Sequence, residues 1–75
     1  MAEIDYVMAY GSEIVPIEVK ANIKARLKSL QQFMHEKASK IGVVISQRPL
    51  QQDQNILYVP FYLISQIPRF IHDIV

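Results

Sequence analysis

The dipeptide Gly11-Ser12 separates two runs of strand-forming residues, and no other feature of the chain constrains the fold more. Residues 3–10 carry bulky apolar residues at a period of two, and residues 13–20 are rich in β-branched side chains, both typical of β-strands. A two-residue loop that begins with glycine is typical of a tight hairpin, because glycine adopts the positive φ that such turns need. We therefore expect a β-hairpin over residues 3–20.

This hairpin determines which charged residues face each other. Counting outward from the two-residue loop places Asp5 opposite Glu18. The same count places Glu3 opposite Lys20, and the alternation of side chains puts all four charged residues on one face. The other face is expected to carry the apolar stripe of the first strand, Ile4, Tyr6, Met8 and Tyr10.

The opposed acids Asp5 and Glu18 have two interpretations. Carboxylates this close repel each other unless a positive charge lies between them. In the first interpretation they bind Mg²⁺ or Mn²⁺, which prefer oxygen ligands, and Lys20 orients or deprotonates a water that attacks a phosphate. In the second, the charges are solvated at a strand end, and Glu3 with Lys20 forms a surface ion pair worth less than ~1 kcal/mol. The residues by themselves leave both interpretations open.

After the hairpin the apolar pattern changes to that of an amphipathic helix. The helix is expected to begin at Asn22 as its N-cap, to run for about four turns and to stop between Ser39 and Gly42. Its buried stripe is expected to be Ile23, Leu27, Leu30 and Met34. Residues 41–46 form a short apolar run, which is typical of a strand buried on both faces.

The last third of the chain predicts a loop, a strand and a helix. Residues 47–55 are polar and predict a loop, and residues 56–59 predict the last strand. From Pro60 onward, apolar residues at helical spacing predict a helix that is interrupted or restarted at Pro68. The order strand, strand, helix, strand, strand, helix predicts an α/β or α+β domain, with the long helix on one face of the sheet.

Composition limits the class of protein. The 75 residues predict one domain, residues 1–75, and the absence of cysteine excludes disulfides, cysteine nucleophiles and iron–sulfur clusters. We expect neither a signal peptide nor a membrane span, because acids lie near the start and prolines and charges interrupt the apolar tail. These features favour the cytoplasm. A net charge of +1 provides no global field that attracts nucleic acid.

Two stretches of sequence carry a resemblance to known families. The string Glu3-Ile4-Asp5 with Glu18-Val19-Lys20 resembles the Asp…Glu-x-Lys signature of the PD-(D/E)XK nuclease superfamily, which has the restriction-endonuclease-like fold. Over nearly its whole length the chain is similar to the uncharacterised C-terminal domain of bacterial and archaeal AAA-type ATPases. The segments that carry this second likeness are residues 16–20, 27–33, 42–44 and 60–63.

The resemblance implies a function and a larger protein. It makes Asp5 and Glu18 metal ligands, adds the carbonyl of Val19 to the ligands, and makes Lys20 the catalytic lysine of a DNA phosphodiesterase. The fold would be a truncated restriction-endonuclease-like core, because the helix and strand that usually precede the first strand have no residues here. An AAA-type ATPase domain is expected upstream in the full-length protein. The alternative is a catalytically inert module that binds a partner or supports assembly.

Basic and polar residues of the predicted helix are candidates for contact with nucleic acid. Lys24 and Lys28 stand four residues apart, where like charges repel unless something such as a phosphate compensates them. Gln32 or its neighbour Gln31 matches a helix glutamine that some related nucleases place near the metal. The alternative for all of them is a solvated polar face.

The apolar tail predicts self-association. Residues 56–75 carry more large apolar side chains than one helix face buries against a four-stranded sheet. We therefore expect a homodimer with the C-terminal segment in the interface and the Asp5–Glu18 face open to solvent.

Overall fold

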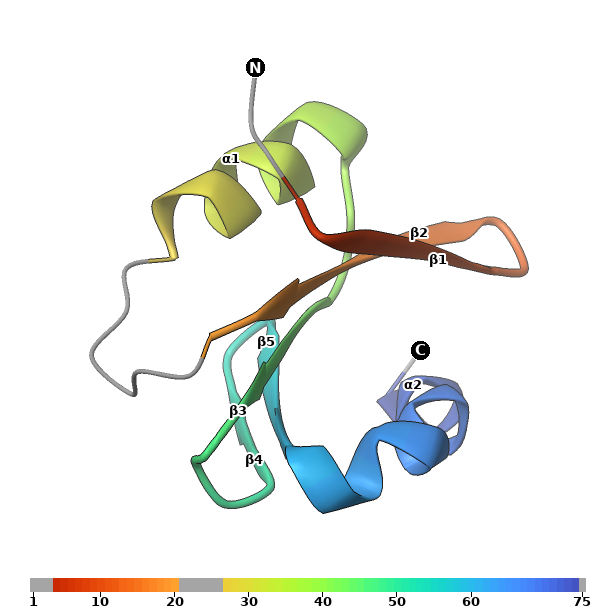
Figure 1. Ribbon diagram of the computed structural model, residues 1–75. Helices are drawn as coiled ribbons and strands as arrows, with labels where there is room; N and C mark the ends of the chain where they lie inside the picture. The colour runs from red at the N-terminus through yellow and green to blue at the C-terminus, as the bar shows by residue number, and fades with distance from the viewer. Residues whose placement is uncertain (1–3, 21–26, 75) are drawn as a thin grey trace.

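The computed structural model describes residues 4–20 and 27–74, which form a sheet with helices on both faces (Figure 1). The elements are β1 (Tyr6–Tyr10), β2 (Glu13–Val19), α1 (Lys28–Lys37), β3 (Gly42–Ser46), β4 (Gln51–Asp53), β5 (Ile56–Pro60), the 3₁₀ helix η1 (Phe61–Gln66) and α2 (Ile67–Ile74). The predicted α+β class is confirmed. No helix in the described ranges is long and apolar enough to cross a membrane.

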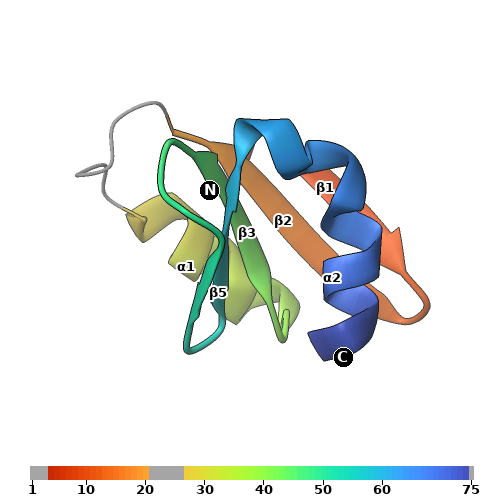
Figure 2. The same cartoon turned by 90° about the horizontal axis from the view of Figure 1, so that it is seen from below.

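The sheet has the strand order β1-β2-β3-β5-β4. β2, β3 and β5 run parallel in its centre, and β1 and β4 pair antiparallel to them at the two edges. Figure 2 shows α1 on one face and η1 with α2 on the other. The carboxyl ends of the three parallel strands therefore lie at the same end of the sheet, which is where open α/β sheets usually bind ligands.

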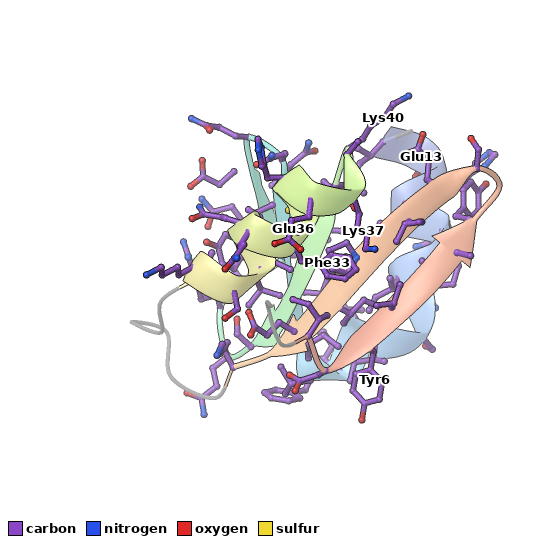
Figure 3. The ribbon with its side chains drawn as sticks, turned by 90° about the horizontal axis from the view of Figure 1, so that it is seen from above. Tyr6, Glu13, Phe33, Glu36, Lys37 and Lys40 are labelled. Carbon is purple, nitrogen blue, oxygen red and sulfur yellow. The ribbon has the colours of Figure 1, made fainter. Side chains whose placement is uncertain are left out.

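The hairpin has the predicted register. Tyr10 lies opposite Glu13, and the pairing continues to Tyr6 opposite Ile17. Gly11 has a φ of 61°, as the tight turn requires. Beyond the turn, Glu13 forms an ion pair with Lys40 in which Nζ lies 3.2 Å from Oε1, so this end of the hairpin is tied to the segment that follows α1 (Figure 3).

The predicted apolar stripe of the first strand is wrong at Ile4. Met8 and Tyr10 pack on the α2 side of the sheet, whereas Ile4 packs against the cluster beneath α1. The regular strand begins only at Tyr6, and Asp5 forms a bend. This bend interrupts the alternation of side chains, so Ile4 joins the opposite face. Tyr6 is 64% exposed and points away from the edge of the sheet (Figure 3).

Each face of the sheet carries its own apolar core. The larger cluster, on the α2 side, consists of Val15, Ile41, Val43, Ile45, Leu57, Val59, Ile67 and Ile71. The smaller cluster, beneath α1, consists of Leu30, Met34, Val44, Ile56 and Tyr58. Because side chains alternate along β3 and β5, neighbouring residues of one strand contribute to opposite clusters. This confirms the predicted strand buried on both faces, although the strand begins at Gly42 and not at Ile41.

The helix α1 is shorter than predicted. It begins at Lys28, and the expected N-cap Asn22 with Ile23 lies outside the described residues. Leu30 and Met34 of the predicted stripe are buried. The helix ends just before the expected stop, because Ala38 adopts a left-handed conformation with a φ of 53°. A chain reversal follows directly, and Ser39 N–H donates to the carbonyl of Met34 at 2.9 Å.

One prediction about the last third of the chain needs correction, and another is confirmed. Residues 47–55 were expected to form a loop but contain the short strand β4, so the sheet has five strands instead of the expected four. The three side chains of β4 are all exposed, so it carries no apolar pattern, and it forms because it pairs with the edge of β5. The predicted interruption of the tail near Pro68 is confirmed, because the 3₁₀ helix η1 ends at Gln66 and the α-helix α2 begins at Ile67. Pro68 stands in the first turn of α2, where the missing N–H has no helical partner to lose.

The predicted homodimer gives a simple expected result. Ile67 and Ile71 of the tail are buried, but Phe61, Tyr62 and Ile64 remain 45%, 83% and 44% exposed. Apolar side chains gathered in this way are typical of association surfaces. Light scattering at micromolar concentration is expected to give about twice the monomer mass of 8.7 kDa. A monodisperse, folded monomer would contradict the prediction.

Candidate functional site

The four residues of the predicted site lie together at the open end of the hairpin. Glu18 and Val19 end β2, Lys20 follows directly, and Asp5 immediately precedes β1. The pairing of Tyr6 with Ile17 places Asp5 and Glu18 at the next step of the two strands. The structure thus brings Asp5, Glu18, Val19 and Lys20 to one end of the hairpin, with Glu18 on the side of the sheet that α1 covers and the Val19 side chain on the opposite side.

Glu18 is buried, with only 6% of its surface exposed. Its Oε1 lies 3.3 Å from Nζ of Lys20. Its Oε2 is buried and has no hydrogen-bond partner among the described residues. A buried carboxylate oxygen without a partner destabilises the fold by its lost hydration. The interpretation of Glu18 as a solvated surface charge is therefore wrong, and its second carboxylate oxygen has no partner among the described residues.

Asp5 is held against the end of β2 by a backbone contact. Its Oδ2 accepts a hydrogen bond from the N–H of Val19 at 2.9 Å. The bend at Asp5 makes this possible, because the carboxylate takes the place that a strand carbonyl would otherwise occupy. The N–H and C=O of one strand residue point to the same neighbour. The carbonyl of Val19 therefore faces the same side as Asp5.

Lys20 links the pair to the neighbouring strand. Its N–H donates to the carbonyl of Ile45 at 2.8 Å, which extends the parallel ladder between β2 and β3 by one residue. Its side chain is one-third exposed, at 33%, while that of Glu18 is 7% exposed. The ammonium group consequently bridges a buried carboxylate and the solvent. Glu3, the expected partner of Lys20, lies outside the described residues.

The helix residues predicted to contact nucleic acid do not join the group formed by Asp5, Glu18, Val19 and Lys20. Lys28 is the exposed first residue of α1. Gln32 is exposed and donates from Nε2 to Oε1 of Glu36 at 3.2 Å, a contact within the helix that does not involve Glu18. Lys24 lies outside the described residues. These three residues stay predictions for nucleic-acid contact.

Residues that the sequence did not single out for this site lie near Glu18 on the neighbouring strands. Glu18 is in register with Val44 of β3, and Val44 with Tyr58 of β5. Ser46, two residues beyond Val44, is buried and accepts a hydrogen bond at Oγ from the N–H of Arg48. The guanidinium of Arg48 lies over the ring of Tyr58. The register of β2, β3 and β5 creates this proximity, and nothing in the linear sequence indicates it.

The donor set fits a hard divalent cation. Two carboxylates and a backbone carbonyl are oxygen ligands, and Mg²⁺ usually takes one or two carboxylates and fills the remaining positions with water and phosphate. The described part of the chain contains no group of three or more His, Asp or Glu residues that would enclose a metal.

Comparison with known proteins gives one match. The family described as "Domain of unknown function (DUF4143)" matches residues 1–64. No curated protein and no solved structure matches the chain. The matched range includes the hairpin, α1 and all five strands, and it ends within η1.

Proposed function

Since the chain belongs to the family described as a domain of unknown function (DUF4143), we propose its activity from the site itself: a divalent-metal-dependent nuclease-like domain that hydrolyses phosphodiester bonds of DNA. One observation carries this proposal. Glu18 is buried with Oε1 on Lys20 and with Oε2 free of any partner among the described residues, and Asp5 lies at the neighbouring position of the hairpin.

In this proposal Asp5, Glu18 and the carbonyl of Val19 hold Mg²⁺ or Mn²⁺. The bound ion supplies charge neutralisation at the phosphate and a more acidic water. Asp5 is positioned by the N–H of Val19, and Glu18 by the ammonium group of Lys20. The partly exposed ammonium of Lys20 provides a positive charge where negative charge develops on the phosphate.

The wider setting follows from the resemblance and is part of the proposal. The Asp…Glu-x-Lys residues are arranged on a hairpin beside a parallel ladder, which supports a truncated restriction-endonuclease-like core. We further propose that an AAA-type ATPase domain precedes the domain in the full-length protein and that the protein acts in the cytoplasm.

A second candidate is a catalytically inert module of the same fold. One observation favours it: only two carboxylates are brought together at the site within residues 4–20 and 27–74. In that case the domain binds a partner or supports assembly, and the Glu18–Lys20 pair is structural.

Metal binding distinguishes the two candidates, because it stabilises only a domain that holds the ion. At a free Mn²⁺ concentration about 100 times the dissociation constant, the folded state gains about 2.7 kcal/mol. For a domain of this size such a gain raises the melting temperature by roughly 10–20 °C. Thermal unfolding with and without Mn²⁺ measures this shift.

Variants assign the shift to the site. Glu18→Gln and Asp5→Asn are expected to remove it, whereas the matched control Glu36→Gln, an exposed acid on α1, is expected to retain it (Figure 3). An equal shift in all three variants would place the metal elsewhere. No shift in the parent protein, up to millimolar Mn²⁺ or Mg²⁺, would favour the inert module.

A further inference from the structure

Arg48 packs closely on an aromatic ring and has no carboxylate partner among the described residues. The centre of its guanidinium lies 3.8 Å from the centroid of the Tyr58 ring. Nη2 donates to Oε1 of Gln51 at a long 3.4 Å. In the described part of the chain no acid lies within ion-pair distance of Arg48.

This arrangement leaves most of the N–H donors of the Arg48 guanidinium without a protein acceptor among the described residues. A guanidinium has five N–H donors, and the contact with Gln51 occupies one of them. Stacking on Tyr58 fixes the plane of the group without occupying its donors, and a planar fork of donors is the arrangement that binds phosphate in a bidentate manner. The residue is half-buried, which further limits its rotamers.

The stack lies on the same face as the Glu18–Lys20 pair. Tyr58 is separated from Glu18 by one strand, since Glu18 faces Val44 and Val44 faces Tyr58. Two strand spacings correspond to about 10 Å across the sheet. Between the two, Ser46 binds the backbone N–H of Arg48 and ends the strand whose Ile45 carbonyl accepts from Lys20.

We propose that Arg48, stacked on Tyr58, binds a backbone phosphate of the DNA strand that runs along the carboxyl ends of β2, β3 and β5, beside the end of the face that α1 covers, two to three nucleotides from the phosphate at the Glu18–Lys20 site. The proposal rests on the proposed function. At an axial rise of 3.4 Å per nucleotide, about 10 Å corresponds to roughly three nucleotides. Arg48 is thus a positioning residue that sets the register of the strand and carries no base specificity.

The salt dependence of DNA binding tests this role, because each phosphate contact contributes to it separately. We would use the Glu18→Gln background, which does not cleave, and a fluorescently labelled DNA duplex without divalent metal. Adding Arg48→Gln is expected to lower the slope of log affinity against log salt by about 0.9 and to weaken binding at 50 mM salt about tenfold. Arg48→Lys is expected to keep the slope, because it keeps the charge.

Arg69→Gln is the matched control. Arg69 also lies over an aromatic ring, that of Phe70 at 5.9 Å, but on α2 at the opposite side of the sheet. It is expected to leave the slope unchanged. Circular dichroism melting of each variant shows that the domain is folded, and Arg48→Gln is expected to melt within a few degrees of its background.

The outcomes separate the two proposals. Suppose that the Glu18→Gln background binds DNA and that Arg48→Gln and Arg69→Gln give equal slopes. That result would overturn the role of Arg48 but leave the proposed function standing. A slope that falls equally in Arg48→Lys and Arg48→Gln would also overturn it, since charge would not be the determinant. If the background binds no DNA at 50 mM salt, the role of Arg48 fails, and cleavage by the parent protein with Mg²⁺ or Mn²⁺ decides the proposed function separately.

Discussion

Replacing Glu18 by glutamine is expected to abolish metal-dependent cleavage of DNA without destabilising the metal-free domain. The substitution keeps the shape of the side chain but removes the charge that holds the cation. Loss of one group that stabilises charge at a reacting centre reduces rates by at least about 100-fold. Plasmid and oligonucleotide cleavage with Mg²⁺ or Mn²⁺ measures this loss.

The stability of the same variant is the more informative half of the test. Oε2 of Glu18 is buried without a partner in the described structure, and Lys20 is exposed enough to be hydrated when its partner is lost. Removing one partner of an ion pair is strongly destabilising only where it leaves the other charge buried, and the ammonium group of Lys20 is one-third exposed and can be hydrated. We therefore expect the free energy of unfolding in EDTA to stay within about 1 kcal/mol of the parent or to rise.

Two further variants complete this experiment. Lys20→Ala is expected to lose cleavage as Glu18→Gln does, and the exposed-acid control Glu36→Gln is expected to cleave as the parent does. Cleavage that persists in both Glu18→Gln and Lys20→Ala would show that the activity has another origin. A loss of more than about 2 kcal/mol in Glu18→Gln would show that the pair is a structural one.

Truncating Ile71 is expected to cost a large part of the total stability. Ile71 is fully buried and, with Ile67, attaches α2 to the larger core. Replacing a buried isoleucine by alanine costs about 2–5 kcal/mol. At about 0.05–0.15 kcal/mol per residue, a domain of 75 residues has roughly 4–11 kcal/mol in total. Urea unfolding of Ile71→Ala should therefore show a midpoint near half that of the parent or lower.

The same substitution at an exposed position is the control. Ile64 in η1 is 44% exposed, and Ile64→Ala is expected to change the free energy of unfolding by less than about 1 kcal/mol. Equal losses for Ile64→Ala and Ile71→Ala would mean that η1 and α2 unfold together and that the tail is buried by another chain. In that case the loss at Ile64 should depend on protein concentration.

The hairpin and its register were predictable because they depend on local chemistry. Gly11 provides the positive φ of the turn, and a loop of two residues leaves one way to pair the strands. Hence the sequence alone predicted that Asp5 and Glu18 lie next to each other. The buried positions Leu30 and Met34 followed as well, since the spacing of apolar residues on a helix reports its buried face.

The order of the strands, the burial of Glu18 and the position of Arg48 depended on tertiary structure. The strand β4 carries no apolar pattern and forms only because β5 offers it an edge. Glu18 is buried because β1, β3 and α1 surround β2, and such burial is a property of the neighbours and not of the residue. Arg48 joins the site through pairings that connect residues 18, 44 and 58. The sequence by itself determined which side chains the two adjacent strands of the hairpin bring together. The packing of distant segments decided which of those side chains are buried.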